Sequence, residues 1–195
     1  MRQYIVQGRC VTDPPPADWR ERLIARLGHR PRRLSNWIEL ALYGMLTCLD
    51  DAGETSLPDN ARLVLSSQRG TAAATLQAIA QCKEGLTMPF TFLQTQPGQC
   101  VATLAATMGW CGNGSFIAST GLESLLQLAA AEEAAGLATG GLLIGWVDDV
   151  DVVRSQWLRL LPSSQTDVSC DKRDTCLSDS VRYVEVGADG VQCWT

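Results

Sequence analysis

Histidine and long apolar runs are the features that this sequence of 195 residues most nearly lacks. Its single histidine is His29, and no Cys-x-x-Cys pair occurs, so a zinc site of histidine and cysteine is not expected. No apolar run approaches the roughly 20 residues that cross a bilayer, so the sequence predicts no membrane span. The first ten residues lack the apolar stretch of a secretory signal, and we therefore expect a cytoplasmic protein.

Charge and cysteine are present, but in patterns that limit what they do. The formal net charge of −5 argues against a nucleic-acid partner for the molecule as a whole. The eight cysteines are scattered and mostly lie in apolar segments, so we interpret them as small, reduced core residues. With 46% hydrophobic and 19% charged residues the composition is that of a globular protein, and we expect residues 1–195 to form one domain.

One basic patch stands out in this acidic chain, between residues 20 and 33. It contains no lysine, one acidic residue (Glu21) and six arginines, namely Arg20, Arg22, Arg26, Arg30, Arg32 and Arg33. Such a patch is either a solvated surface loop or a docking site for an acidic partner. His29 lies inside the patch, and we interpret it as a loop residue rather than a catalytic base.

Residues 112–149 form the segment around which the other elements can be placed. Residues 115–118 and 142–147 are apolar runs that predict strands, and residues 120–135 between them have the pattern of a helix. Many acyl-transferring enzymes place their nucleophile where such a strand passes into such a helix, because the helix N-terminus offers unpaired N–H groups. Here that corner holds Ala118 and Ser119 and no cysteine.

The helix expected at residues 120–135 is apolar around most of its circumference. A helix of this kind is expected to be buried on all sides, so part of its cover has to come from a partner surface. Thr120 and Glu123 have the spacing of a T-x-x-E capping box, which would use the N–H groups that an acyl oxyanion otherwise binds.

The remaining segments alternate between strands and helices. Strands are expected at residues 3–11 and 61–66, and helices from residue 18, from Ser35 to the Asp50-Asp51-Ala52-Gly53 turn, at 71–82 and at 98–109. Residues 85–97 are expected to be irregular, the pattern loosens after Asp149, residues 163–180 predict a mobile loop, and 181–194 predict a hairpin. The fold class is therefore α/β, with a mostly parallel sheet, helices on both faces and an antiparallel edge hairpin.

The order of these motifs resembles the N-terminal half of a β-ketoacyl synthase. The likeness rests on LYGMLTCLDDAG at residues 42–53, LVLSSQRGT at 63–71, MPFTF at 88–92 and GLLIGWVDD at 141–149. RRLSNWIELAL at residues 32–42 is similar to the short, chain-length-factor-type proteins of aryl polyene and type II polyketide systems. The resemblance implies a thiolase-like fold, a role in polyketide, aryl polyene or fatty-acyl chain biosynthesis, and a vacant nucleophile position at Ala118 or Ser119.

The same resemblance implies where other molecules bind. A heterodimer or heterotetramer with a full-length β-ketoacyl synthase is expected, because the ketosynthase dimer interface contains the strand equivalent to Ser115, Phe116, Ile117 and Ala118. Candidates to wall an acyl tunnel, for which plain core packing is at least as good an explanation, are Met88, Phe90, Phe92 and Trp110. Candidates to dock an acyl carrier protein are Arg26, Arg30, Arg32 and Arg33.

The residues that are present argue against condensation chemistry in this chain by itself. Decarboxylative condensation needs a thiolate and donors that are usually two histidines, and the chain has one histidine. Two alternatives to a non-catalytic subunit stay open. One is a stand-alone acyltransferase or hydrolase that uses Cys100, Cys111 or Ser119, and the other is a scaffold protein that retains the fold. No cofactor is predicted.

Overall fold

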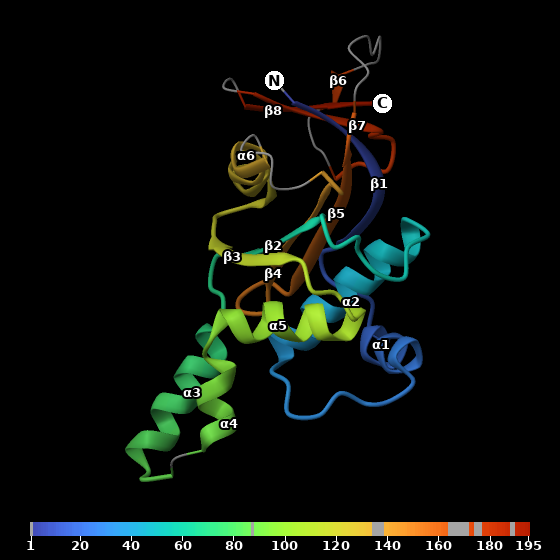
Figure 1. The fold of residues 1–195 in the computed structure, drawn as a ribbon. Helices are drawn as coiled ribbons and strands as arrows, with labels where there is room; N and C mark the ends of the chain where they lie inside the picture. The colour runs from blue at the N-terminus through green and yellow to red at the C-terminus, as the bar shows by residue number, and fades with distance from the viewer. Residues whose placement is uncertain (1, 87, 134–138, 164–171, 174–176, 188–189) are drawn as a thin grey trace.

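The computed structural model describes residues 2–86, 88–133, 139–163, 172–173, 177–187 and 190–195. Its elements are, in order, β1 (Arg2–Thr12), α1 (Trp19–Leu27), α2 (Asn36–Asp51), β2 (Arg62–Ser67), α3 (Ala72–Lys83), α4 (Pro89–Gln94), α5 (Pro97–Met108), β3 (Asn113–Ala118), α6 (Leu122–Glu133), β4 (Leu142–Asp148), β5 (Arg154–Pro162), β6 (Lys172–Arg173), β7 (Tyr183–Gly187) and β8 (Gly190–Trp194). The strands form one sheet with helices on both faces (Figure 1), which confirms the α/β class.

The sheet is mixed, with the strand order β3-β2-β4-β5-β1-β7-β8-β6. β2 pairs in parallel with β3 on one side and with β4 on the other. β5 runs antiparallel to both of its neighbours, β4 and β1, so β1 points the same way as the three parallel strands. The hairpin of β7 and β8, which is confirmed, extends the sheet beyond β1 with antiparallel pairings. The predicted parallel arrangement therefore holds for three adjacent strands only.

β5 is the strand that the sequence pattern did not reveal. Arg154–Pro162 lies inside the sheet, although it carries Gln156 and Arg159 at buried positions. Polar residues at buried positions interrupt the apolar run by which a buried strand is normally found. Arg159 is accommodated because Glu54 binds its guanidinium in two places, at 2.7 Å from Nε and 3.0 Å from Nη2.

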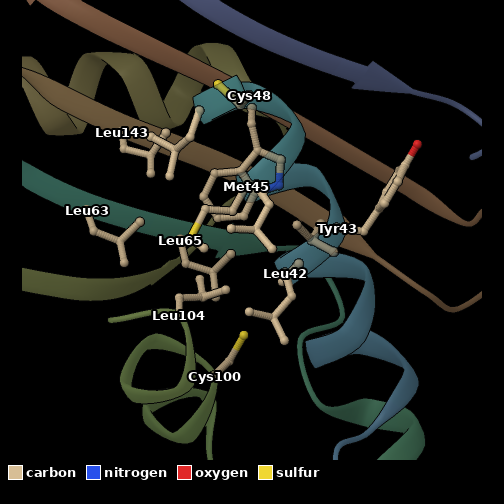
Figure 2. Packing of buried hydrophobic residues seen from close by; sticks show 14 of the residues in the cluster. Leu42, Tyr43, Met45, Cys48, Leu63, Leu65, Cys100, Leu104 and Leu143 are labelled. Carbon is tan, nitrogen blue, oxygen red and sulfur yellow. The ribbon is translucent and has the colours of Figure 1, made fainter. Parts of the chain in front are cut away.

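The larger core lies on the face of the sheet that α2 and α5 cover. α2 begins after Ser35, whose side-chain oxygen accepts a hydrogen bond from the N–H of Ile38 (3.3 Å), so the predicted start is confirmed. Figure 2 shows the side chains of α2 and α5 converging on β2 and β4, with Leu42, Met45, Leu65, Leu143 and Leu104 among them.

Two glycines allow the indole of Trp157 to enter this core. A Cβ atom at Gly44 of α2 or at Gly145 of β4 would lie 2.5 Å from atoms of the Trp157 ring. The indole is fully buried, and its Nε1 donates to Ser155 Oγ (2.9 Å), which in turn donates to the carbonyl of Leu40 (3.1 Å). These contacts hold α2 close against β4 and β5.

The second core lies on the opposite face, beneath α6. Its members from the helix pack with residues from both ends of the chain, including Tyr4 and Val6 of β1, Val184 of β7 and Cys193 of β8. A register shift between Val6 and Gly8 turns β1 over, so that Cys10 belongs to the core on the α2 face. β1 therefore contributes to both cores.

Two predictions about α6 are wrong for the chain by itself. The carbonyl of Gly121 accepts the bond from Leu125 N (3.4 Å) and the helix begins at Leu122, so Gly121 takes the N-cap place that the predicted capping box gave to Thr120. One face of α6 is buried, whereas Leu128 on the other face is 45% exposed. The pattern misled because alanines count as apolar, yet a small side chain such as that of Ala131 stays exposed at little cost.

Three further expectations need correction or fall outside the described residues. The segment expected to be irregular contains α4, which starts with Pro89 at its first turn. Cys193 is disulfide-bonded, so the expectation of reduced cysteines is wrong there, although Cys10, Cys48, Cys82, Cys100 and Cys111 are free. Most of the predicted mobile loop, including Cys170 and Cys176, lies outside the described residues. Among the described helices, none is long and apolar enough to cross a membrane.

Candidate functional site

The corner expected to hold a nucleophile lies where the three parallel strands end. Ser67 of β2 is in register with Ala118 of β3, and Ser66 is in register with Trp146 of β4. The carboxyl ends of parallel strands meet at one edge of a sheet, which is where ligands bind in open α/β proteins. Ser119 follows β3 at this edge and leads into α6.

Ser119 is engaged in local hydrogen bonds. Its hydroxyl donates to the carbonyl of Gly121 (3.0 Å) and lies 2.7 Å from Ser66 Oγ. Because a hydroxyl has one hydrogen, Ser66 is the donor of that second bond. The carbonyl of Ser119 accepts from the indole Nε1 of Trp146 (3.4 Å), so the residue ties β2, β4 and α6 together at the corner.

The three candidate nucleophiles are not brought to a base in the described part of the chain. Cys100 is fully buried in the core, where burial raises the pKa of its thiol. Cys111 is exposed, but it precedes the amino end of β3, about 20 Å from the corner at about 3.3 Å per residue of strand. His29 is exposed between α1 and α2, with Nδ1 3.0 Å from the carbonyl of Leu27.

Asp148 and Asp149 complete the corner, and the sequence had marked them only as the end of a strand. The buried carboxylate of Asp148 accepts from Ser67 Oγ and from the N–H groups of Gln68 (3.2 Å) and Arg69 (3.1 Å), which fixes the turn after β2. Asp149 Oδ2 accepts from Asn36 Nδ2 (3.2 Å), while its buried Oδ1 has no hydrogen-bond partner in the described structure. Burial raises the pKa of Asp149.

β3, which carries the expected interface residues, is an edge strand. Within the described sheet it pairs with β2 alone, which leaves its other edge unpaired. Phe116 lies edge-on to Trp37 with ring centroids 6.0 Å apart, and Ser115 Oγ accepts from Arg62 Nη2 (3.4 Å). Ala118, at the end of the strand, is exposed.

The expected tunnel residues fall into two places. Met88, Phe90 and Phe92 are 54%, 48% and 63% exposed at α4, which projects with α3 from the body of the molecule (Figure 1). Trp110 is buried after the C-terminus of α5 and donates from Nε1 to the carbonyl of Pro58 (2.9 Å). α5 separates the two places by about 18 Å, since a helix rises about 1.5 Å per residue.

An apolar cavity of about 660 Å³ lies between α3 and α4 and is lined by Thr75, Ala78, Ile79, Cys82 and Phe92. Leu76, Ile79 and Leu86 are exposed on or beside α3. The two helices therefore form an apolar arm, defined here as residues 72–86 and 88–94. Exposed apolar surface of this extent is typical of an interaction site.

The four expected docking arginines differ in what they contact. Arg26 is paired with Asp50 (2.9 Å). The guanidinium of Arg33 lies 4.4 Å from the centroid of Phe90, which places the arginine loop beside the apolar arm. Arg30 and Arg32 are exposed, and their side chains contact no other described residue through a hydrogen bond or an ion pair.

No family model matches this sequence, and no curated protein matches it. Solved structures with a similar fold do exist. The ishigamide ketosynthase/chain length factor aligns with a TM-score of 0.62 at 14% identity, over 89% of this chain and 67% of that chain. A ketosynthase structure with a type II polyketide synthase acyl-carrier protein, bound to the hexaketide, aligns with a TM-score of 0.60 at 12% identity, over 83% and 63%.

A third similar structure has nearly the same length as this chain. It is the complex of the ketosynthase ApeO with its chain length factor ApeC from Xenorhabdus doucetiae, which aligns with a TM-score of 0.58 at 16% identity, over 96% of this chain and 99% of that chain. At these identities the likeness concerns the fold. The chain has the thiolase-like fold of ketosynthases and chain length factors, as its sequence motifs predicted.

Proposed function

We propose that this chain is a non-catalytic, chain-length-factor-type subunit that pairs with an active β-ketoacyl synthase. The observation that carries the proposal is the edge strand β3, whose free edge ends at Ala118, beside a serine that is held by its neighbours. An unpaired strand edge is a template for a strand of another chain. The role is in polyketide, aryl polyene or fatty-acyl chain assembly.

The state of the corner supports a role without catalysis. Ala118 has no nucleophilic group, and the hydroxyl hydrogen of Ser119 is directed at the carbonyl of Gly121 rather than at a base. An activated serine or cysteine needs a base within hydrogen-bond reach. The chain's one histidine lies in the loop between α1 and α2. Acyl transfer or hydrolysis by this chain alone is therefore the weaker proposal.

The apolar arm gives the subunit a way to influence its partner. Met88, Phe90 and Phe92 are exposed in the isolated chain, and we propose that they enter the partner and wall its acyl tunnel. Trp110 does not belong with them, because it lies at the other end of α5 and its indole is used inside the core. Filling a tunnel with aromatic side chains sets the length of chain it holds.

The arginine loop supplies a place for an acidic carrier protein. Arg30 and Arg32 are exposed without partners among the described residues, and Arg33 lies over Phe90 at the edge of the arm. Arginine favours carboxylate partners because its planar guanidinium forms two parallel hydrogen bonds with a carboxylate. Arg26 is less suited to this role because Asp50 already binds it.

Co-expression with the ketosynthase encoded nearest to this chain tests the proposal. Size-exclusion chromatography with light scattering is expected to show a 1:1 or 2:2 complex, with condensation activity that the isolated chain lacks. Ala118→Lys places a long charged side chain at the exposed end of β3 and should weaken the complex at least about tenfold. Ala131→Lys, at an exposed position of α6, is the matched control and should leave the complex unchanged.

Three outcomes would count against the proposal. A stable monomer indifferent to the ketosynthase would favour the scaffold reading. Equal effects of the two lysine variants would move the interface away from β3. Selective labelling of Cys111 by a thiol reagent at neutral pH, together with hydrolase activity of the chain alone, would favour the enzyme reading.

A further inference from the structure

A polar cavity on the α6 face of the sheet is left unexplained by subunit pairing through β3. It has a volume of about 380 Å³ and lies between the N-terminus of α6, Trp146 of β4 and Arg154 and Gln156 of β5. Its apolar wall is formed by Leu122, Leu126 and Leu177. Volumes of this order are typical of sites for small molecules.

The N-terminus of α6 presents N–H groups to this cavity. The first helical hydrogen bond runs from Leu125 N to the carbonyl of Gly121, so the N–H groups of Leu122, Glu123 and Ser124 precede the helical ladder. No side chain of the described residues caps them. α6 has 12 residues, and the N-terminus of a helix of this length attracts negative charge.

Gln156 is the second, independent sign of a ligand. It is 8% exposed, lies opposite Trp146 in the strand register and lines the cavity. Its side-chain amide forms no hydrogen bond with any described residue, although a buried amide without a partner is costly. A polar ligand in the cavity would satisfy it.

Arg154 supplies the charge. Its guanidinium lies 5.1 Å from the centroid of the Trp146 ring, and its Nη1 is 3.6 Å from an oxygen of Asp13, whose side chain is 40% exposed. The long contact with a solvated carboxylate leaves most of its N–H groups available. Arg154 is the only cationic side chain among the residues that line the cavity, and Glu123 is the only anionic one.

We propose that this cavity binds a small organic monocarboxylate. The carboxylate is received by Arg154, by the side-chain N–H group of Gln156 and by the first N–H groups of α6, and the apolar part of the ligand lies along Leu122, Leu126 and Trp146. One cation beside Glu123 suits a single negative charge and disfavours a phosphate dianion. The apolar wall in turn favours a carboxylate that carries a hydrocarbon tail over a small inorganic anion.

Calorimetric titration of the isolated chain with octanoate tests this inference, and it does not depend on ketosynthase pairing. Octanoate is expected to bind saturably, while 1-octanol and inorganic phosphate should bind at least about tenfold more weakly. Arg154→Met and Gln156→Leu should each weaken octanoate binding about tenfold or more. Glu123→Gln should strengthen it a few-fold, because it removes a repelling charge.

Arg22→Met is the matched control, since Arg22 is exposed on α1 and is paired with Asp18 far from the cavity in sequence. It should leave binding unchanged, and thermal unfolding of each variant shows that the fold is kept. Absence of saturable octanoate binding up to about 10 mM would overturn the proposal. Binding of 1-octanol as tight as that of octanoate, or an Arg154→Met variant that binds like the wild type, would overturn it too.

Discussion

The two faces of the sheet are covered by different means. On one face, α2 and α5 bury a continuous core that includes Trp37 and Trp157, and two glycines admit the second indole. On the other face a single helix, α6, is completed by β1 and by the hairpin of β7 and β8, which come from the two ends of the chain. The first face is therefore closed by helices from the middle of the chain, whereas the second depends on its ends.

A charge beneath the C-terminal hairpin should give the largest effect. Val184→Asp buries an unpaired carboxylate, because Val184 is fully buried between β1 and β8. We expect the free energy of unfolding to fall by about 4 kcal/mol or more. Urea denaturation measures the change. Val152→Asp, at an exposed site, should cost less than about 0.5 kcal/mol, and similar costs for the two variants would mean that the hairpin does not hold the α6 face together.

Two leucines of α6 separate its buried face from its exposed face. Leu126 is buried beneath the helix and Leu128 is exposed, so Leu126→Ala should cost about 2–5 kcal/mol and Leu128→Ala less than about 1 kcal/mol. Urea denaturation of the isolated chain measures both. Should Leu128→Ala prove as costly as Leu126→Ala, α6 would have cover on both sides in solution.

The glycine cradle of Trp157 sets the sensitivity of the α2 face. Gly145→Ala places a methyl group 2.5 Å from the indole and should cost about 1–3 kcal/mol through overpacking. Gly98→Ala in α5 meets no atom within 4 Å and should stabilise the protein by about 0.5–1 kcal/mol, because alanine favours a helix. Thermal unfolding of both variants would contradict the cradle if the two melting temperatures moved in the same direction.

Asp149 gives the smallest effect, and it depends on pH. Burial raises the pKa of this carboxyl in the folded chain, so its protonated form contributes stability that is present below the unfolded pKa of about 3.9 and is lost as pH rises through the folded value. Asp149→Asn removes this loss and keeps an acceptor for Asn36. We expect a rise of at most about 4 °C in Tm at pH 7 and no gain below about pH 4. An equal gain at both values would exclude ionisation as the cause.

The local pattern of the sequence identified the elements whose burial alternates in a regular way. β2 and β4 are apolar runs, α2 has a serine cap, and the hairpin is marked by glycine at its turn, so each was found close to its observed bounds. The pattern failed for β5, where Arg159 and Gln156 occupy buried places, because their partners are distant in sequence or are missing from the described structure. A short helix such as α4 is equally hard to find, since six residues contain too few helical turns to show a period.

The sequence also located the vacant corner of the site but could not describe its surroundings. Ala118 and Ser119 were placed at the end of a strand by the βαβ pattern alone, and the single histidine already argued against condensation chemistry. The bonds that hold Ser119, the cavity beside it and the grouping of Arg154 with Gln156 join residues up to 53 positions apart in the chain, as the contact of Ser66 with Ser119 illustrates. Such pairs leave no periodic signal.

By itself, the sequence determined the α/β class, the βαβ unit around residues 115–147 and the absence of a cysteine from its corner, because these follow from local apolar periodicity and from residue identity. Only the tertiary structure decided that β5 enters the sheet antiparallel, that α6 is buried on one face and that the apolar arm stands apart from Trp110. Those outcomes depend on which distant surfaces exclude water from one another, and burial of this kind is a property of the assembled chain rather than of any one segment.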